Sequence, residues 1–253
     1  MTNPLSAPSV SVVVPAYNEA ERIGATLDRL FEWCAEHKRE AEIIVVDDGS
    51  ADATQERVAA AQPRFPRLRL IRLPENRGKG AAVRAGVLAA QGERILVCDA
   101  DLSTPIEEES RLASALDRGF DIAIGSRGLP ESDIRIHQPR YRELMGRTFN
   151  RIVRIATGLS FRDTQCGFKL FTRDAARAVF DPATVQRFAF DVEVLLIARE
   201  RGLEVCEVPV KWSHAEQSRV SAVSDSARML RDVLQLRLAR SRLNRMWSSA
   251  RRG

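Results

Sequence analysis

Short apolar runs alternate with longer amphipathic stretches along the first half of the chain. Runs rich in β-branched residues, separated by stretches whose apolar positions have helical spacing, are typical of strands that alternate with helices. The pattern predicts strands at 9–14, 41–46, 68–73, 94–98 and 121–125, and helices at 19–37, 52–61, 78–90 and 106–117. Because these strands are almost continuously apolar, we expect an α/β fold, with a mostly parallel sheet covered by helices on both faces.

Polar side chains gather where four of these strands end. In a parallel sheet the carboxyl ends of the strands share one edge, and ligands bind beyond that edge. The segments that follow the strands are Pro15-Ala16-Tyr17-Asn18-Glu19, Asp47-Asp48-Gly49-Ser50, Asn76-Arg77-Gly78-Lys79-Gly80 and Asp99-Ala100-Asp101. The sequence therefore predicts that most of its chemistry lies along a single rim.

Two carboxylates on this rim, Asp99 and Asp101, are two residues apart at a strand end. The period-two geometry of a strand can point both side chains the same way. Hard oxygen donors placed like this suit Mg²⁺ or Mn²⁺, which are completed by waters and substrate phosphates. A solvated acidic turn that caps the next helix would have the same sequence. Asp48 also has two possible roles: its carboxylate either caps the next helix or binds a base or a ribose.

The glycine-rich segment at 76–80 precedes the third predicted helix. Its glycines would let backbone N–H groups and the helix dipole approach an anion, and Lys79 would add a positive charge. The segment is not a Walker A loop, and no G-x-G-x-x-G follows the first strand. The sequence therefore gives no support to a kinase, an ATPase or a dehydrogenase.

The composition is that of an ordinary globular protein, with 44% hydrophobic and 29% charged residues. No apolar run approaches the roughly 20 residues needed to cross a bilayer, and residues 1–9 lack the features of a secretory signal. The four cysteines are widely spaced, which predicts reduced thiols and no zinc or redox site. We therefore expect a cytoplasmic protein.

Positive charge is concentrated near the C-terminus. Residues 219–253 hold nine arginines and two aspartates, a net charge of +7, whereas the whole chain carries +5. Charge alone does not choose between nucleic acid and membrane head groups as the partner of this segment. The same segment carries an apolar stripe, which either enters a membrane surface or packs on the rest of the protein, formed by Met229, Leu230, Val233, Leu234 and Leu238 and extended by Leu243, Met246 and Trp247.

The four rim segments, in this order and spacing, resemble the nucleotide-sugar half of the family 2 inverting glycosyltransferases of GT-A fold. Later segments resemble the polyprenyl-phosphate branch of that family, in particular dolichyl-phosphate glucosyltransferases and, less closely, dolichyl-phosphate mannose synthases. These later segments are Gly125-Ser126-Arg127, Asp163-Thr164-Gln165-Cys166-Gly167-Phe168-Lys169, Phe190-Asp191-Val192-Glu193 and Glu207-Val208-Pro209-Val210-Lys211-Trp212. The resemblance covers roughly residues 9–240.

The resemblance implies a role for each rim segment. Asp99, Ala100 and Asp101 would hold the ribose, the diphosphate and the metal, and Arg127 would hold a phosphate. Two departures stand out: Ser103 occupies the place of a glutamine that mannose synthases tend to have, and the chain lacks the membrane helices of many relatives. The nucleoside would be held by Pro15, Ala16, Tyr17, Glu19 and Asp48.

For a nucleotide-sugar donor, the difficult step is departure of the diphosphate. A divalent ion at Asp101, helped by Lys79 or an arginine, would stabilise the developing charge. A lipid monophosphate acceptor has a second pKa near 6 and arrives largely ionised, so it needs cations more than a base. Arg127 and Arg142 are candidates to hold it, although each is equally consistent with a solvated surface charge.

Three further residues are each open to a functional and a structural interpretation. Asp191 and Glu193 would bind sugar hydroxyls, or supply a base if the acceptor is a hydroxyl, or else lie on the polar side of a helix at 190–201. Lys169 would reach a carboxylate or phosphate, or form a structural ion pair. Together with the residues discussed above, the candidate catalytic residues are Asp101, Arg127 and Asp191.

We expect a catalytic GT-A domain at 9–215 and a basic amphipathic segment at 216–253. The favoured function is inverting transfer of glucose from UDP-glucose to a polyprenyl phosphate, with Mg²⁺ or Mn²⁺. The partners would be a nucleotide sugar, the lipid acceptor and the cytoplasmic face of a membrane, reached directly or through an anchoring subunit, and not nucleic acid. The alternatives are a GDP-mannose-dependent mannose synthase and a non-catalytic membrane adaptor with a degenerate fold.

Overall fold

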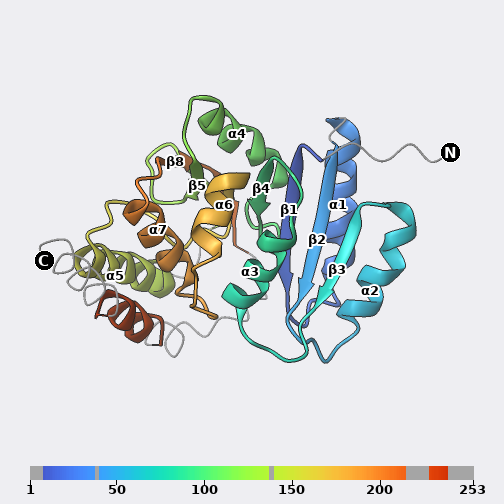
Figure 1. Cartoon of the computed structure of the whole chain (residues 1–253), viewed down its shortest axis with the longest axis horizontal. Helices are drawn as coiled ribbons and strands as arrows, with labels where there is room; N and C mark the ends of the chain where they lie inside the picture. The colour runs from blue at the N-terminus through green and yellow to red at the C-terminus, as the bar shows by residue number, and fades with distance from the viewer. Residues whose placement is uncertain (1–7, 38–39, 137–139, 215–227, 239–253) are drawn as a thin grey trace, which may run out of the picture.

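The structure is a computed structural model that describes residues 8–37, 40–136, 140–214 and 228–238. Seven strands form one sheet in the order β3-β2-β1-β4-β7-β5-β8 (Figure 1). The neighbours pair in parallel except for β7, which is antiparallel to both β4 and β5. The strands are β1 (Val10–Ala16), β2 (Ala41–Asp47), β3 (Leu68–Arg72), β4 (Arg94–Val97), β5 (Ile122–Ser126), β7 (Lys169–Thr172) and β8 (Val205–Pro209).

Helices cover both faces of this sheet, so the predicted α/β architecture is confirmed. Two short strands, β6 (Asp133–Ile136) and β9 (Lys211–Ser213), form a separate parallel pair. The α-helices are α1 (Ile23–Glu36), α2 (Thr54–Ala61), α3 (Lys79–Ala89), α4 (Glu109–Asp117), α5 (Arg140–Thr157), α6 (Arg173–Phe180) and α7 (Phe190–Glu200), and the 3₁₀ turns are η1 (Gln62–Arg64) and η2 (Ile106–Glu108).

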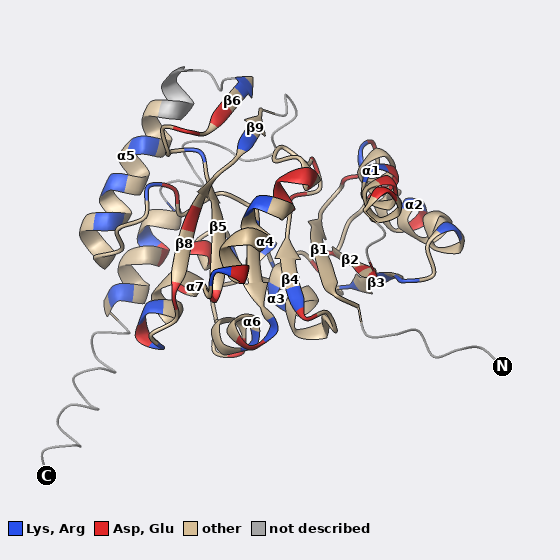
Figure 2. Cartoon of the chain, turned by 90° about the horizontal axis from the view of Figure 1, so that it is seen from above, with Lys and Arg blue, Asp and Glu red and all other residues tan. Residues whose placement is uncertain are grey.

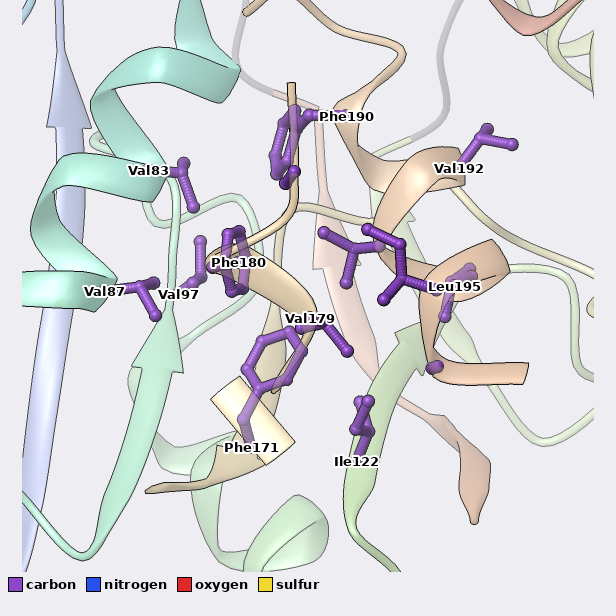
Figure 3. Close-up of a cluster of buried hydrophobic side chains, with 14 of the residues drawn as sticks. Val83, Val87, Val97, Ile122, Phe171, Val179, Phe180, Phe190, Val192 and Leu195 are labelled. Atoms are coloured by element: carbon purple, nitrogen blue, oxygen red, sulfur yellow. The ribbon is translucent and has the colours of Figure 1, made fainter. Parts of the chain in front are cut away.

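Each face of the sheet has its own core. One core joins apolar side chains of the sheet to α1, α2 and α4. The other joins the sheet to α3, α5, α6 and α7, and Figure 3 shows its centre. There the rings of Phe171 and Phe180 meet edge to face, with centroids 5.5 Å apart. Because both faces are buried, the strands can be apolar throughout, as the sequence pattern indicated.

The structure differs from the prediction in the order of strands in the sheet and in where helices begin. Strand β7 comes from a distant part of the chain and inserts between β4 and β5, which local periodicity does not reveal. Helix α1 begins at Ile23 and not at residue 19, because Asn18 has a φ of 54° and residues 17–22 form turns before the helix. The N–H of Ile23 donates to the carbonyl of Glu19, 2.9 Å away, and this hydrogen bond joins the turn to the start of the helix.

Residues 228–238 form a helix that packs on the core shared by the sheet and α5. Met229 and Val233 are buried in the same core as Phe149 and Val153 of α5, whereas Leu234 and Leu238 are exposed. The apolar stripe is therefore divided between packing and solvent. Its predicted extension at Leu243, Met246 and Trp247 lies outside the described residues. Across the part of the chain that the structure describes, no helix combines the length and apolarity needed to span a membrane.

Candidate active site

Backbone and side-chain hydrogen bonds bring the first two rim segments together beyond β1 and β2. The hydroxyl of Ser50 accepts a bond from the N–H of Asn18 at 2.8 Å, and the side-chain carbonyl of Asn18 accepts one from the N–H of Ala51, also at 2.8 Å. The N–H of Asp48 donates to the carbonyl of Ala16, 2.8 Å away. The left-handed conformation of Asn18 is thus held from both sides, and the neighbouring Tyr17 ring is left 40% exposed at the rim.

In the structure, the glycine-rich segment binds a carboxylate of the protein itself, that of Asp48. The buried carboxylate of Asp48 accepts hydrogen bonds from the N–H groups of Arg77 and Gly78, both at 2.8 Å. Gly78 has a φ of 105°, and a β-carbon there would lie 2.7 Å from the carbonyl of Gln186, so this position requires glycine. Burial raises the pKa of Asp48, and the two N–H groups oppose that rise. These two donors are therefore not available to a ligand, contrary to the expectation from sequence.

Asp99 and Asp101 follow β4 at the same edge, in a turn where Leu102 has a φ of 46°. The Nζ of Lys79 lies 2.5 Å from Oδ1 of Asp99, and Oδ1 of Asp101 accepts a bond from the N–H of Ser103 at 2.9 Å. Among the described residues, no third Asp, Glu, His or Cys joins the two carboxylates. Two partly exposed, hard oxygen donors fit a divalent ion whose remaining ligands are waters or substrate phosphates. Ala100, between them, is buried, and its carbonyl accepts from Thr26.

The loop at 163–168 lies directly behind Asp99. A β-carbon on Gly167 would lie 2.1 Å from Oδ2 of Asp99, so the carboxylate could not keep its present position beside any other residue. The Nζ of Lys169 holds this loop, because it donates to the carbonyl of Cys166 at 2.5 Å. The same Nζ donates to Oδ1 of Asp191, also at 2.5 Å, and both side chains are buried. Lys169 therefore forms an ion pair that supports the loop.

Arg127 forms the other boundary of this loop. Its Nε and Nη2 donate to the two oxygens of Asp163 at 2.7 and 3.0 Å, and its backbone N–H donates to Oδ2 at 3.0 Å. Burial alone would raise the pKa of Asp163, but the guanidinium lowers it to about 2. The guanidinium carbon lies 5.4 Å from the ring centroid of Trp212, in a cation–π contact. The arginine that was expected to hold a phosphate is thus fixed in position by a carboxylate and an indole.

A cavity of about 1360 Å³ opens beside Arg127. Its lining comes from α5, the residues that follow β5 and the segment at 158–165. The charged part of the lining holds Arg127, Arg147, Arg151, Arg154, Arg162 and Asp163. The apolar part includes Phe149, Ile155, Leu159 and Met229. The cavity therefore offers positive charge and apolar surface together, which suits an amphiphilic anion.

The remaining candidate residues are placed as follows. Pro15 is the next-to-last residue of β1, which ends at Ala16 at the rim, and Glu19 forms an ion pair with Arg22. Arg142 lies in α5, but its side chain is outside the described residues. Both oxygens of Glu193 accept bonds from the N–H of Thr184, at 3.0 and 3.1 Å, so this carboxylate supports a loop.

Sequence reasoning did not identify Arg147, Arg151, Arg154 and Arg162 as parts of one cavity. The signal that points to them is the stretch from Ile134 to Gly158, where six arginines and one glutamate are interleaved with apolar residues. Gly167 was likewise part of a recognised segment, but its contact with Asp99 depends on two loops from distant parts of the chain.

Comparison with known proteins gives a consistent result. The model of the family described as "Glycosyl transferase family 2" matches residues 11–180. Dolichyl-phosphate beta-glucosyltransferase ALG5C of Trichomonas vaginalis is 42% identical over 88% of this chain and 69% of its own length. The dolichyl-phosphate beta-glucosyltransferase of Homo sapiens is 36% identical over 90% of this chain and 75% of its own length.

Solved structures share the fold. Glucosyl-3-phosphoglycerate synthase of Mycobacterium tuberculosis, in complex with Mn²⁺, UDP-glucose and phosphoglyceric acid, superposes with a TM-score of 0.67. That alignment covers 92% of this chain and 79% of the other, at 21% identity. The resemblance inferred from the sequence motifs is confirmed.

Proposed function

Because the chain belongs to glycosyl transferase family 2, we propose that it transfers glucose from UDP-glucose to a polyprenyl phosphate such as dolichyl phosphate, giving a β-linked lipid-phosphate sugar. The relatives with 42% and 36% identity are dolichyl-phosphate beta-glucosyltransferases, which supports both the sugar and the acceptor. The observation that carries the proposal is that one short loop borders both parts of the site. Residue 167 of this loop contacts Asp99, and Asp163 and Gln165 line the arginine-rich cavity.

The donor would lie along the rim of β1, β2 and β4. Pro15, Ala16, Tyr17 and Glu19 would surround the nucleoside, with Asp48 fixing the loop beside it. Asp99 and Asp101 would hold Mg²⁺ or Mn²⁺, which supplies positive charge for the departing diphosphate. The ammonium group of Lys79, whose Nζ lies 2.5 Å from Oδ1 of Asp99, would add a second positive charge beside the diphosphate. The Mycobacterium tuberculosis synthase with Mn²⁺ and UDP-glucose is a precedent for this type of donor in the fold.

The acceptor phosphate would enter the cavity beside Arg127. Guanidinium groups bind phosphate oxygens through paired, charge-assisted hydrogen bonds, and Asp163 and Trp212 hold Arg127 ready to do so. Arg142, earlier in α5, is a further candidate for the same phosphate. The apolar lining at Phe149, Leu159 and Met229 suits the first isoprene units.

The engagement of Asp191 also favours a phosphate acceptor over a hydroxyl acceptor, which would need a base. The carboxylate of Asp191 is buried and holds Lys169 at 2.5 Å, so it is engaged in the ion pair that supports the loop. A monophosphate with a second pKa near 6 is mostly dianionic at neutral pH and attacks without losing a proton. Arg127 would then orient the attacking oxygen, and Asp191 would act through Lys169.

Such an acceptor resides in a bilayer, so the protein would work at the cytoplasmic face of a membrane, peripherally or with an anchoring partner. The catalytic unit would be residues 9–215, with the basic segment 216–253 at the membrane.

The test is a panel of UDP-glucose, UDP-galactose and GDP-mannose, each offered with a short polyprenyl phosphate and Mg²⁺ or Mn²⁺. We expect a lipid-linked glucose from UDP-glucose alone. Product from GDP-mannose would identify a mannose synthase instead. Transfer to 3-phosphoglycerate but not to the polyprenyl phosphate would contradict the lipid acceptor.

A further inference from the structure

Exposed apolar side chains are concentrated at one end of the molecule. Among the side chains that the structure describes, the large apolar ones that are exposed are Tyr17, Ile136, Leu144, Ile152, Ile155, Leu234 and Leu238. Apart from Tyr17 at the donor rim, they belong to β6, α5 and the helix at 228–238. Figure 1 shows α5 and the dark red helix next to each other, at the end of the molecule opposite α2. Such a concentration marks an interaction surface, whereas scattered exposed residues are ordinary.

In both helices, some apolar side chains are buried in the core and others are exposed. In α5, Phe149 and Val153 face the core, whereas Leu144 is 67% exposed and Ile155 is 74% exposed. In the second helix Val233 is buried, whereas Leu234 is 44% exposed and Leu238 is 58% exposed. Each helix thus has one apolar side that stabilises the fold and further apolar residues that are exposed.

Positive charge surrounds these apolar residues. Arg147, Arg151 and Arg154 are exposed on α5, where Figure 2 shows basic residues at successive turns. Arg231 and Arg237 are exposed on the helix at 228–238. Apolar side chains among arginines match the boundary between acyl chains and anionic head groups, where guanidinium groups meet lipid phosphates and leucines lie below them.

The cavity opens at this same surface. Ile155 lines the cavity although most of its side chain is exposed, so it lies at the mouth. Met229, from the second helix, lines the cavity as well. Arg127 and three arginines of α5 line this same cavity.

We propose that α5 and the helix at 228–238 form a docking face for an anionic lipid bilayer, consisting of Leu144, Ile152, Ile155, Leu234 and Leu238 with the arginines around them. The mouth of the cavity then faces the bilayer. An acceptor lipid enters sideways from the membrane, with its phosphate at Arg127 and most of its chain still among the acyl chains. This route rests on the proposed function, whereas the docking face itself does not.

The test uses the full chain with three leucines changed together, Leu144→Ser, Leu234→Ser and Leu238→Ser. All three are exposed and lie outside the cavity lining, so the fold and the site are preserved. The matched control has phenylalanine at the same three positions, which keeps the apolar surface. Binding is measured by sedimentation with phosphatidylcholine vesicles that contain or lack phosphatidylglycerol.

We expect the serine variant to bind the anionic vesicles at least about tenfold more weakly than the wild type, and the phenylalanine variant to bind within about twofold of it. Added salt and neutral vesicles should each weaken binding of the wild type. Turnover of a short, water-soluble polyprenyl phosphate should be unchanged in both variants. Turnover of a long-chain acceptor in vesicles should fall with vesicle binding in the serine variant only.

Vesicle binding of the serine variant equal to that of the wild type would overturn the proposal. Equal loss of activity with short and long acceptors would also overturn it, because the leucines would then act on the site and not on the membrane. Failure of the proposed function would look different: leucine-dependent binding to vesicles without any sugar transfer.

Discussion

The α-carbon of Gly167 packs directly against the carboxylate of Asp99. A β-carbon at position 167 would lie 2.1 Å from Oδ2 and 2.7 Å from Oδ1, distances at which one of the two groups must move. The loop has little freedom to move, because Lys169 ties the carbonyl of Cys166 to Asp191. The position of Asp99 therefore depends on a glycine 68 residues further along the chain.

Gly167→Ala should therefore displace the Asp99 carboxylate. Because a shift of about 1 Å in a catalytic group costs about 100-fold in rate, we expect turnover to fall by roughly that factor. Mn²⁺ affinity, measured by calorimetry without donor, should fall as well. The matched control is Gly24→Ala in α1, where an added β-carbon meets nothing within 4 Å. Wild-type turnover in the Gly167 variant would show that the contact does not position the site.

Asp101→Asn keeps the shape of the side chain and removes its charge. If Asp101 holds the metal ion, turnover should fall by orders of magnitude, on the scale of about 2.7–4 kcal/mol or more in transition-state stabilisation. The melting temperature should change little. Asp117→Asn, which removes a carboxylate from a surface ion pair with Arg94, serves as the control and should keep its activity. Full activity of the Asp101 variant at saturating Mg²⁺ or Mn²⁺ would refute the metal assignment.

Asp191→Asn separates two ways of activating the acceptor. If the acceptor is a phosphate, the rate should rise with pH through about 6 as the phosphate ionises, and this acidic limb should persist in the variant. If Asp191 is the base, the limb should vanish with the carboxylate. Rates are compared per folded enzyme, with circular dichroism giving the folded fraction. Loss of the limb would exclude the phosphate-acceptor mechanism.

The buried ion pair of Lys169 and Asp191 should contribute to the free energy of unfolding. Lys169→Met leaves the Asp191 carboxylate without this partner and should lower the free energy of unfolding by about 3–5 kcal/mol. Adding Asp191→Leu should recover part of that loss, because two apolar side chains replace two buried charges. Urea unfolding of both single variants and the double variant gives the coupling free energy. Strict additivity would mean that the two side chains do not interact.

The ion pair of Asp163 and Arg127 should contribute stability that depends on pH. The pKa of Asp163 is lowered to about 2, below the roughly 3.9 of an unfolded chain, so the folded state binds this proton less tightly. The contribution is therefore complete above about pH 5 and is lost as the pH falls towards 2, amounting to about 2–3 kcal/mol. In urea unfolding, the difference between wild type and Asp163→Asn should shrink between pH 6 and pH 3. A difference that stays constant would contradict the lowered pKa.

Much of this protein could be predicted from local patterns. The five strands of the first half and the helices between them follow from apolar periodicity, because burial on both faces of a sheet leaves few polar positions in a strand. The gathering of Asp48, Lys79, Asp99 and Asp101 on one rim follows from parallel topology alone. The motifs also identified the family, since their order and spacing reflect the same local turns.

Other features were decided only by contacts between distant segments. Asp48 occupies the N–H groups of Arg77 and Gly78, a pairing that no periodicity predicts. Lys169 belongs to an antiparallel strand inserted between β4 and β5, which brings its ammonium group to Asp191. The C-terminal apolar stripe is divided between the core and the surface because α5 covers only one side of it. Apolar periodicity indicates which side chains are buried. It does not indicate which residues they contact, because those contacts form between segments that are distant in the sequence and depend on tertiary packing.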